Sequence, residues 1–200
     1  LLLGVSVIPV VIIGVLGFQF GKQALHDQIV ESYTAIAEGR EATIIQFLNE
    51  KKMLVEAMAA DAFIEESVHD LGVKRGKSGL ATKLSAYLTD KKLPVDRSVA
   101  TILVMGLDGK VIAATSTSEI GRDYSRDAIF QHGLKGGYIA DITRESSSSP
   151  ALFSVASPIT DLHDDRVLLG VIVSRIVNSE LNGITTNREG LGETGEVYIV

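Results

Sequence analysis

The stretch that decides the fold is TILVMGLDGKVIAAT, residues Thr101–Thr115. Two apolar runs rich in β-branched residues flank the dipeptide Asp108-Gly109. An Asp-Gly pair between such runs is a strong hairpin signal, because these residues tolerate the positive φ angles of a type I′ turn. The stretch therefore predicts an antiparallel hairpin with a type I′ turn, and this hairpin would open a single sheet.

Three later runs extend the predicted sheet. Residues Gly137–Thr143, GYIADIT, alternate like a half-buried strand, and Ala151–Ile159 suits a partner strand. Val167–Val177, VLLGVIVSRIV, is so continuously apolar that it predicts a central strand. A short helix is expected at Tyr124–Leu134, in the loop between the second and third strands. The order predicts an α+β fold with a five-stranded antiparallel sheet, one face of which a long N-terminal helix covers.

The N-terminal run Leu1–Phe20 contains no charged residue. About twenty apolar residues in a helix match the roughly 30 Å hydrocarbon core of a bilayer. A cleaved secretory signal is the alternative, but its apolar region is shorter and ends in a small-residue cleavage site. The run therefore favours a retained transmembrane helix over residues 1–21, in the plasma (inner) membrane.

A helical pattern follows the apolar run. Apolar residues recur at heptad spacing from Ile29 and Tyr33 onward, and no proline occurs between Lys22 and Leu93. A helix over Lys22–Val68 would be roughly 70 Å long, which is more than a small domain can cover. Two interpretations stay open for residues 22–70: a signalling helix that forms a homodimer with a second copy, and an amphipathic helix that packs along the sheet.

Composition and motifs exclude several classes of function. The net charge is −6 and no basic stripe occurs, which argues against nucleic-acid binding. The chain has no cysteine, so disulfides and thiol chemistry are excluded. It lacks the nucleophile elbow, the zinc-protease pair and the dinucleotide fingerprint, and we expect no enzyme activity, cofactor or metal site in this segment.

The ordered set of segments LVMGLDGKVIAAT, IGRDYSRDAIFQHGLKGGYIAD, ALFSVASPI and LLGVIVSRIV resembles the Cache family of extracellular sensor domains. This resemblance implies a PAS-like sheet in a membrane-distal module at residues 99–180, after a connector with a short helix at 71–98. Residues 181–200, which end in GLGETGEVYIV, would form a linker and the first strand of a truncated second module.

The family has an amino-acid-binding pattern with Arg-x-Trp-Tyr on the short helix and an Asp on the last strand. When the chain is aligned on Phe130, the Arg position falls on Asp127 and the Trp position on Ile129. The Asp position falls on Arg175. The two charges are interchanged, so the resemblance does not imply standard α-amino-acid recognition here.

Arg175 is the main candidate for ligand contact, because it interrupts an apolar strand and its planar guanidinium suits a carboxylate or phosphate. The alternative is an internal ion pair of Arg175 with Asp127 or Asp141 that only supports the fold. The full set of predicted ligand-binding residues consists of aromatic walls and polar groups: Tyr124, Asp127, Phe130, Tyr138, Asp141, Ser154, Ser157 and Arg175.

The sequence thus predicts the extracytoplasmic sensor portion of a transmembrane signal-transduction receptor. A two-component sensor histidine kinase is favoured over a chemotaxis receptor, and the ligand would be a small anionic or zwitterionic solute. The long helix would relay its binding. The alternative is a ligand-free, membrane-anchored interaction protein with a structural sheet domain. A cavity near Tyr124, Phe130 and Tyr138 would favour the sensor.

Overall fold

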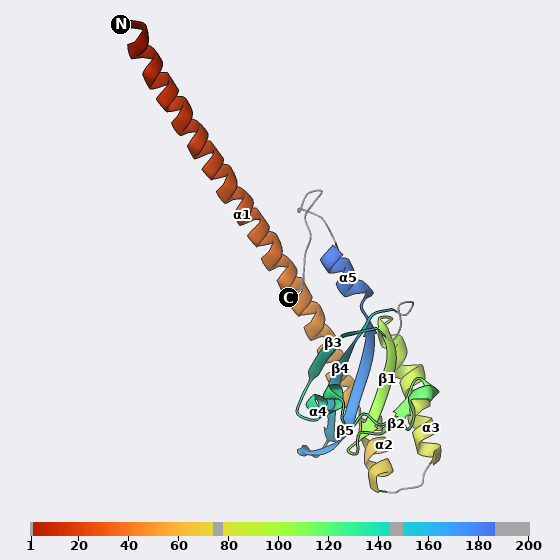
Figure 1. The fold of residues 1–200 in the computed structure, drawn as a ribbon. Coiled ribbons are helices and arrows are strands. Elements are labelled where there is room, and N and C mark those ends of the chain that lie inside the picture. The colour runs from red at the N-terminus through yellow and green to blue at the C-terminus, as the bar shows by residue number, and fades with distance from the viewer. Residues whose placement is uncertain (1, 74–77, 145–149, 187–200) are drawn as a thin grey trace. The chain divides into compact units, whose positions relative to one another are not determined.

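The computed structural model describes residues 2–73, 78–144 and 150–186 (Figure 1). Most side chains of the predicted membrane helix, residues 1–21, lie outside the described part, as does the predicted strand at the C-terminal end of residues 181–200. Across the side chains that are described, no helix combines the length and the apolar content that a membrane crossing requires.

The centre of the fold is a five-stranded antiparallel sheet, as predicted, and its strands lie in the order β2-β1-β5-β4-β3 (Figure 1). β5 is the central strand, and it pairs with β1 on one side and β4 on the other. The strands are β1 (Val99–Gly106), β2 (Val111–Ala114), β3 (Tyr138–Thr143), β4 (Leu152–Asp161) and β5 (Asp164–Val177).

The predicted hairpin forms, but the type I′ turn is wrong. Asp108 keeps a negative φ, and only Gly109 is in the left-handed region, at φ 77°. The Gly109 N–H donates to the Gly106 carbonyl at 2.9 Å, and the Gly106 N–H donates to the Lys110 carbonyl at 3.0 Å. This is the pattern of a type I turn closed by a left-handed glycine, in which an extra residue lets one glycine carry the only positive φ.

The described residues form five α-helices: α1 (Leu2–Ala59), α2 (Ala62–Val73), α3 (Ser78–Tyr87), α4 (Ala128–Gly133) and α5 (Ser179–Thr186). A π-helical turn (Leu88–Lys92) and a 3₁₀ turn (Leu93–Val95) follow α3, and another 3₁₀ turn spans Thr117–Glu119.

The helical pattern over Lys22–Val68 is interrupted at Ala60 and Asp61. The Asp61 Oδ1 accepts hydrogen bonds from the N–H groups of Phe63 and Ile64, at 3.0 and 3.2 Å. This is the geometry of an N-terminal cap, which satisfies backbone donors that a helix start leaves free. Asp61 therefore starts α2 as a separate helix.

The chain divides into two units. One contains residues 1–43 and 185–200, and the other is the sheet unit, Ile44–Ile184. In the first unit, the part of α1 after residue 17 exposes apolar side chains at Phe18, Phe20, Leu25, Ile29 and Tyr33.

The sheet unit buries both faces of the sheet. The face toward the C-terminal part of α1, α2 and α3, here called the helix face, buries Ile102, Phe153, Ile172 and Ile176 against side chains that include Val55. The other face, here called the α4 face, buries a separate cluster. Its members are Leu103, Met105, Val111, Ala114, Phe130, Ala156, Val171 and Val173.

Two ion pairs tie helices to the segment that precedes β1. Lys51 of α1 lies 2.6 Å from Asp96, and Lys92 lies 2.6 Å from Asp61. Burial raises the pKa of both carboxyls, but hydrogen bonds from Lys51 and Ser98 to Asp96, and from Lys92 and Tyr87 to Asp61, more than offset it. The pKa of each carboxyl is therefore lowered. Because the native pKa values are depressed, this stability is present above the unfolded values near ~4 and is lost as pH falls through the native values.

The Lys51 pair gives a prediction about stability. Lys51→Met should lower the free energy of unfolding at neutral pH by about 1–3 kcal/mol, since it removes a charged donor from a carboxylate that is only 19% exposed. Urea titrations at neutral and acidic pH measure this. The loss of stability on acidification should also be smaller in the variant than in the parent chain, and equal losses would contradict the pairing.

Two glycines with positive φ form a matched pair for testing the hairpin. A Cβ at Gly109 would lie 2.5 Å from the Ser125 Cα, whereas a Cβ at Gly121, at φ 84°, would meet nothing within 4 Å. Gly121→Ala should cost about 1 kcal/mol of unfolding free energy for the backbone strain alone. Gly109→Ala should cost a further 1–3 kcal/mol or so for the steric overlap. If urea unfolding gave the same loss of unfolding free energy for both variants, the Ser125 backbone would have to shift away from the new Cβ at little cost.

Candidate functional site

Arg175 lies on the α4 face of the central strand. In the sheet register it is opposite Thr101 of β1 and Ser154 of β4. Since side chains alternate along a strand, Arg175 shares its face with Val173, while Ser174 and Ile176 point to the helix face. β5 thus presents a charge to one side and apolar contacts with the helices to the other.

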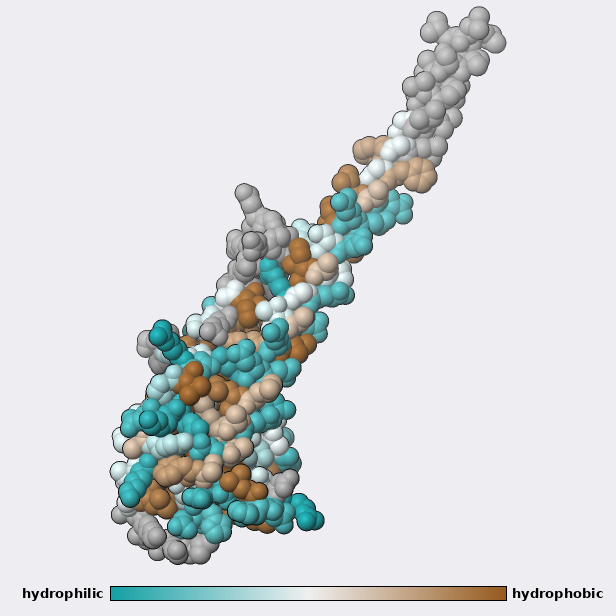
Figure 2. All heavy atoms as spheres, turned by 180° about the vertical axis from the view of Figure 1, so that it is seen from behind, coloured by the Kyte–Doolittle hydropathy of each residue, from teal (hydrophilic) through white to brown (hydrophobic). Residues whose placement is uncertain are grey.

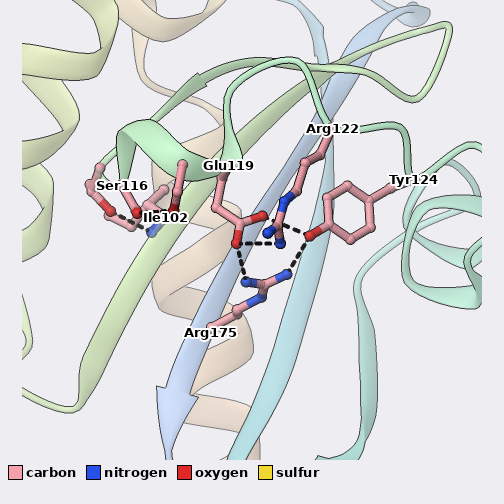
Figure 3. A network of polar contacts seen from close by, with 8 residues as sticks. Ile102, Ser116, Glu119, Arg122, Tyr124 and Arg175 are labelled. Carbon is pink, nitrogen blue, oxygen red and sulfur yellow. Dashed lines mark hydrogen bonds and ion pairs between the residues drawn. The ribbon is translucent and has the colours of Figure 1, made fainter. Parts of the chain in front are cut away.

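The Arg175 guanidinium is bound by a loop that follows β2 (Figure 3). Its Nη1 lies 3.0 Å from Glu119 Oε1, and its Nη2 donates to the Tyr124 hydroxyl oxygen at 2.7 Å. The Tyr124 hydroxyl donates to Glu119 Oε2 at 2.7 Å, and Arg122 Nη1 donates to Glu119 Oε1 at 3.1 Å. We call these four residues, Glu119, Arg122, Tyr124 and Arg175, the Arg175 cluster.

Burial and charge are balanced within this cluster. The side chain of Glu119 is only 7% exposed and that of Arg175 18%, whereas Arg122 is 55% exposed. Burial raises the pKa of Glu119, but the Tyr124 hydrogen bond and the charges of Arg175 and Arg122 outweigh it, so the pKa is lowered. Burial lowers the pKa of Arg175, but the nearby Tyr124 and Glu119 raise it by more, so the pKa of Arg175 is raised overall. The Arg175 guanidinium also lies 5.7 Å from the Tyr124 ring centre.

Backbone hydrogen bonds to β2 place the cluster. The Gly121 N–H donates to the Val111 carbonyl at 2.8 Å, and the Val111 N–H donates to the Arg122 carbonyl at 2.9 Å. The Tyr124 N–H reaches the Gly109 carbonyl at 2.9 Å. The segment from Glu119 to Tyr124 is therefore bound along the hairpin, which fixes where its side chains meet β5.

α4 packs directly on the sheet through Gly133. A Cβ at this position would lie 2.9 Å from both Ala156 Cβ and Val171 Cγ1. Phe130, one turn earlier, is buried in the apolar cluster of the α4 face. The C-terminal end of α4 is thus in close contact with β4 and β5.

Some of the predicted site residues share this region. Tyr124 contacts Arg175 directly, Ser154 is opposite Arg175 in the register, and Phe130 lies in the apolar cluster beside them. Tyr138 pairs with Ala156 at the edge of the sheet and stacks on His132, with ring centres 4.6 Å apart.

Other predicted residues lie elsewhere. Asp127 is exposed at the start of α4, and Asp141 is exposed on β3. Ser157 is paired with Ile172 in the sheet register, so its side chain points to the helix face, opposite Arg175. The two internal partners proposed for Arg175, Asp127 and Asp141, are replaced by Glu119. The sequence pattern does not reveal Glu119 and Arg122, because they lie in a polar loop without hydrophobic periodicity.

Among the grooves of the described part of the chain are two that Arg175 does not line. One runs along α2, and the other is lined by residues that include Arg144, Ala151 and Asn178.

A scan against protein-family models finds no match, and a search of curated proteins finds no similar sequence. Solved structures do match. The sensor domain of the V. cholerae histidine kinase DctB has a TM-score of 0.63 at 17% identity, over 78% of this chain and 58% of that one. The sensory domain of the Campylobacter jejuni chemoreceptor Tlp3 with isoleucine bound has a TM-score of 0.60 at 14% identity, over 82% and 66% of the two chains.

A third match is the ligand-binding domain of the Pseudomonas aeruginosa amino acid chemoreceptor PctC in complex with GABA. Its TM-score is 0.53 at 14% identity, over 74% of this chain and 60% of that one. All three neighbours are sensor or ligand-binding domains, not catalytic ones. The fold is that of Cache-type sensor domains, which confirms the resemblance at the level of structure. This chain spans little more than half, 58%, of the DctB domain that it matches.

The Arg175 cluster predicts a measurable coupling. In a double-mutant cycle of Glu119→Gln and Arg175→Met, the unfolding free energies should show a coupling of about 1–3 kcal/mol, since both groups are largely buried. The matched cycle of Glu119→Gln with Arg122→Met should show a much smaller coupling, because Arg122 is exposed. Similar couplings in the two cycles would mean that burial does not strengthen the Arg175 pair.

Proposed function

We propose that this chain is the extracytoplasmic ligand-sensing part of a transmembrane signal-transduction receptor. The observation that carries the proposal is Arg175, a partly buried guanidinium on the face of a Cache-type sheet that α1 does not cover. A histidine kinase receptor is favoured over a chemoreceptor. Residues 1–21 would anchor it in the plasma membrane, and residues 22–70 would form a homodimer with a second copy.

The ligand that suits the cluster is a small zwitterion or anion. A ligand carboxylate would take the guanidinium of Arg175, but it would then approach Glu119, whose charge has the same sign. An ammonium group on the same ligand would pair with Glu119 and so leave neither charge buried without a partner. A zwitterion therefore fits better than a simple anion. Support comes from the similar domains with bound isoleucine and GABA, both of which carry a carboxylate and an amino group.

The central strand supplies a route from the ligand to α1. Arg175 faces the proposed ligand, and its neighbour Ser174 lies on the opposite face, with its hydroxyl 4.0 Å from the Met58 sulfur of α1. A ligand that binds two positions of β5 unequally would shift α1. Cysteine pairs placed along Ile29–Phe47, in a chain with no native cysteine, should then cross-link at ligand-dependent rates. Equal rates with and without ligand would exclude this relay.

A second candidate function is a ligand-free, membrane-anchored interaction protein with a structural sheet domain. The mutual pairing of Glu119, Tyr124 and Arg175 favours it, because each of these three side chains has a partner without any solute.

Calorimetric titration with a panel of amino acids and organic acids distinguishes the two functions. If the sensor proposal holds, one class of zwitterion binds, and Arg175→Met weakens it about tenfold or more. The matched control is Arg166→Met at the start of the same strand, whose side chain is 93% exposed and should have no effect. If the Arg175→Met variant bound as well as the parent chain, Arg175 would not be part of the ligand site. If no compound of the panel bound, the ligand-free interaction protein would be favoured.

A further inference from the structure

A groove of about 410 Å³ runs along α2, beside α3 and the turn between β4 and β5. α2 and this turn lie at the same end of the sheet (Figure 1). Four carboxylates line the groove: Glu65, Glu66 and Asp70 from α2 and Asp161 from the end of β4. No lysine or arginine is among the described residues that line it. The described lining thus combines four carboxylates with two histidines, His69 and His163.

Glu65 is the residue that points to a ligand. It is only 6% exposed, and its side chain lines the groove. Within the described part of the chain no group donates a hydrogen bond to its carboxylate or pairs with it. The positive end of the helix dipole favours an acidic residue in the first turn of α2. The dipole does not explain why the Glu65 side chain is buried. A largely buried carboxylate that lines a groove and has no partner in the described part of the chain can pair with a cationic ligand, which would supply the missing partner.

Asp161 supplies a second oxygen at the other side of the groove. Its Oδ1 accepts the backbone N–H groups of His163 and Asp164, at 2.7 and 3.3 Å. The His163 N–H is the main reason why the pKa of Asp161 is lowered. In the described structure Oδ2 has no hydrogen-bond partner, so it is available to a donor.

Apolar side chains lie among these acids. Phe63 and Leu162 are 37% and 51% exposed, and both line the groove together with Leu80. Such a surface suits alkyl carbons, which a bare metal ion lacks. The described residues also contain no group of three or more side chains placed to hold a metal ion. The chemistry of the groove thus favours an organic cation over an inorganic one.

The groove is separate from the Arg175 cluster. α2 places Ile64 and Val68 in the core of the helix face, whereas Arg175 and Tyr124 lie on the α4 face. The rear view shows side chains of polar and apolar residues mixed over the outer surface of the sheet unit (Figure 2). Occupation of one site therefore does not require the other.

We propose that this groove is a binding site for a small aliphatic amine, with a diamine as the best match. One ammonium would pair with Glu65, the other would reach Asp161, and the alkyl chain would contact Phe63 and Leu162. Glu66 would add long-range attraction.

Calorimetric titration of the full chain with putrescine at neutral pH tests the site. Putrescine should bind, and the isosteric variant Glu65→Gln should weaken binding about tenfold. Glu66→Gln, which changes an exposed residue and leaves the core untouched, should weaken it less. The matched control Glu50→Gln, on an exposed position of α1 outside the groove, should leave the affinity unchanged. Circular dichroism of each variant verifies that it is folded.

Three results would overturn the proposal. The first is the absence of any putrescine binding to the parent chain. The second is equal binding by the Glu65→Gln and Glu50→Gln variants. The third is binding that Arg175→Met abolishes and Glu65→Gln does not, because the amine would then occupy the α4 face. A parallel titration with Mg²⁺ alone should give no binding that depends on Glu65. If Mg²⁺ did bind in a Glu65-dependent way, the groove would be a metal site and not an amine site.

Discussion

The burial of β5 on both faces is the constraint on which the rest of the structure depends. The strand lies in the middle of the sheet, and its alternating side chains enter two separate apolar clusters. A polar side chain on the buried part of the strand, residues 170–176, must therefore find a partner within the protein or in a ligand. Arg175 pairs with Glu119 and Tyr124, and the backbone hydrogen bonds that bind the loop after β2 along the hairpin hold both partners in place.

Features that depend on local periodicity could be predicted from the sequence. The alternation over Gly137–Thr143 and the apolar run at Val167–Val177 gave the right strands, and the latter is the central one. Features set by distant contacts could not. The turn at Gly109 depends on its fit against Ser125, and Glu119 meets an arginine 56 residues away through a loop without periodicity. The break at Asp61 depends on a cap that an otherwise helical pattern conceals.

The interchanged charges of the amino-acid pattern acquire a physical meaning in this geometry. A positive charge on the last strand requires a negative one near it, and the chain supplies that charge from the Thr117–Glu119 turn instead of from α4. Asp127, at the position that carries the arginine of the pattern, is exposed and separate. A positive and a negative charge thus still meet at β5, but the negative charge comes from a different element, which is the basis for the zwitterionic ligand proposed above.

The contact of Gly133 with β4 and β5 has a mechanical consequence for α4. Because even a methyl group at this position would overlap Ala156 and Val171, the C-terminal end of the helix has no room to approach the sheet further. The N-terminal end begins at exposed Asp127, whose side chain makes no capping hydrogen bond. Gly133 therefore sets how closely α4 packs on the sheet, and the Asp127 N–H, which donates to the Tyr124 carbonyl at 2.9 Å, connects the start of the helix to the Arg175 cluster.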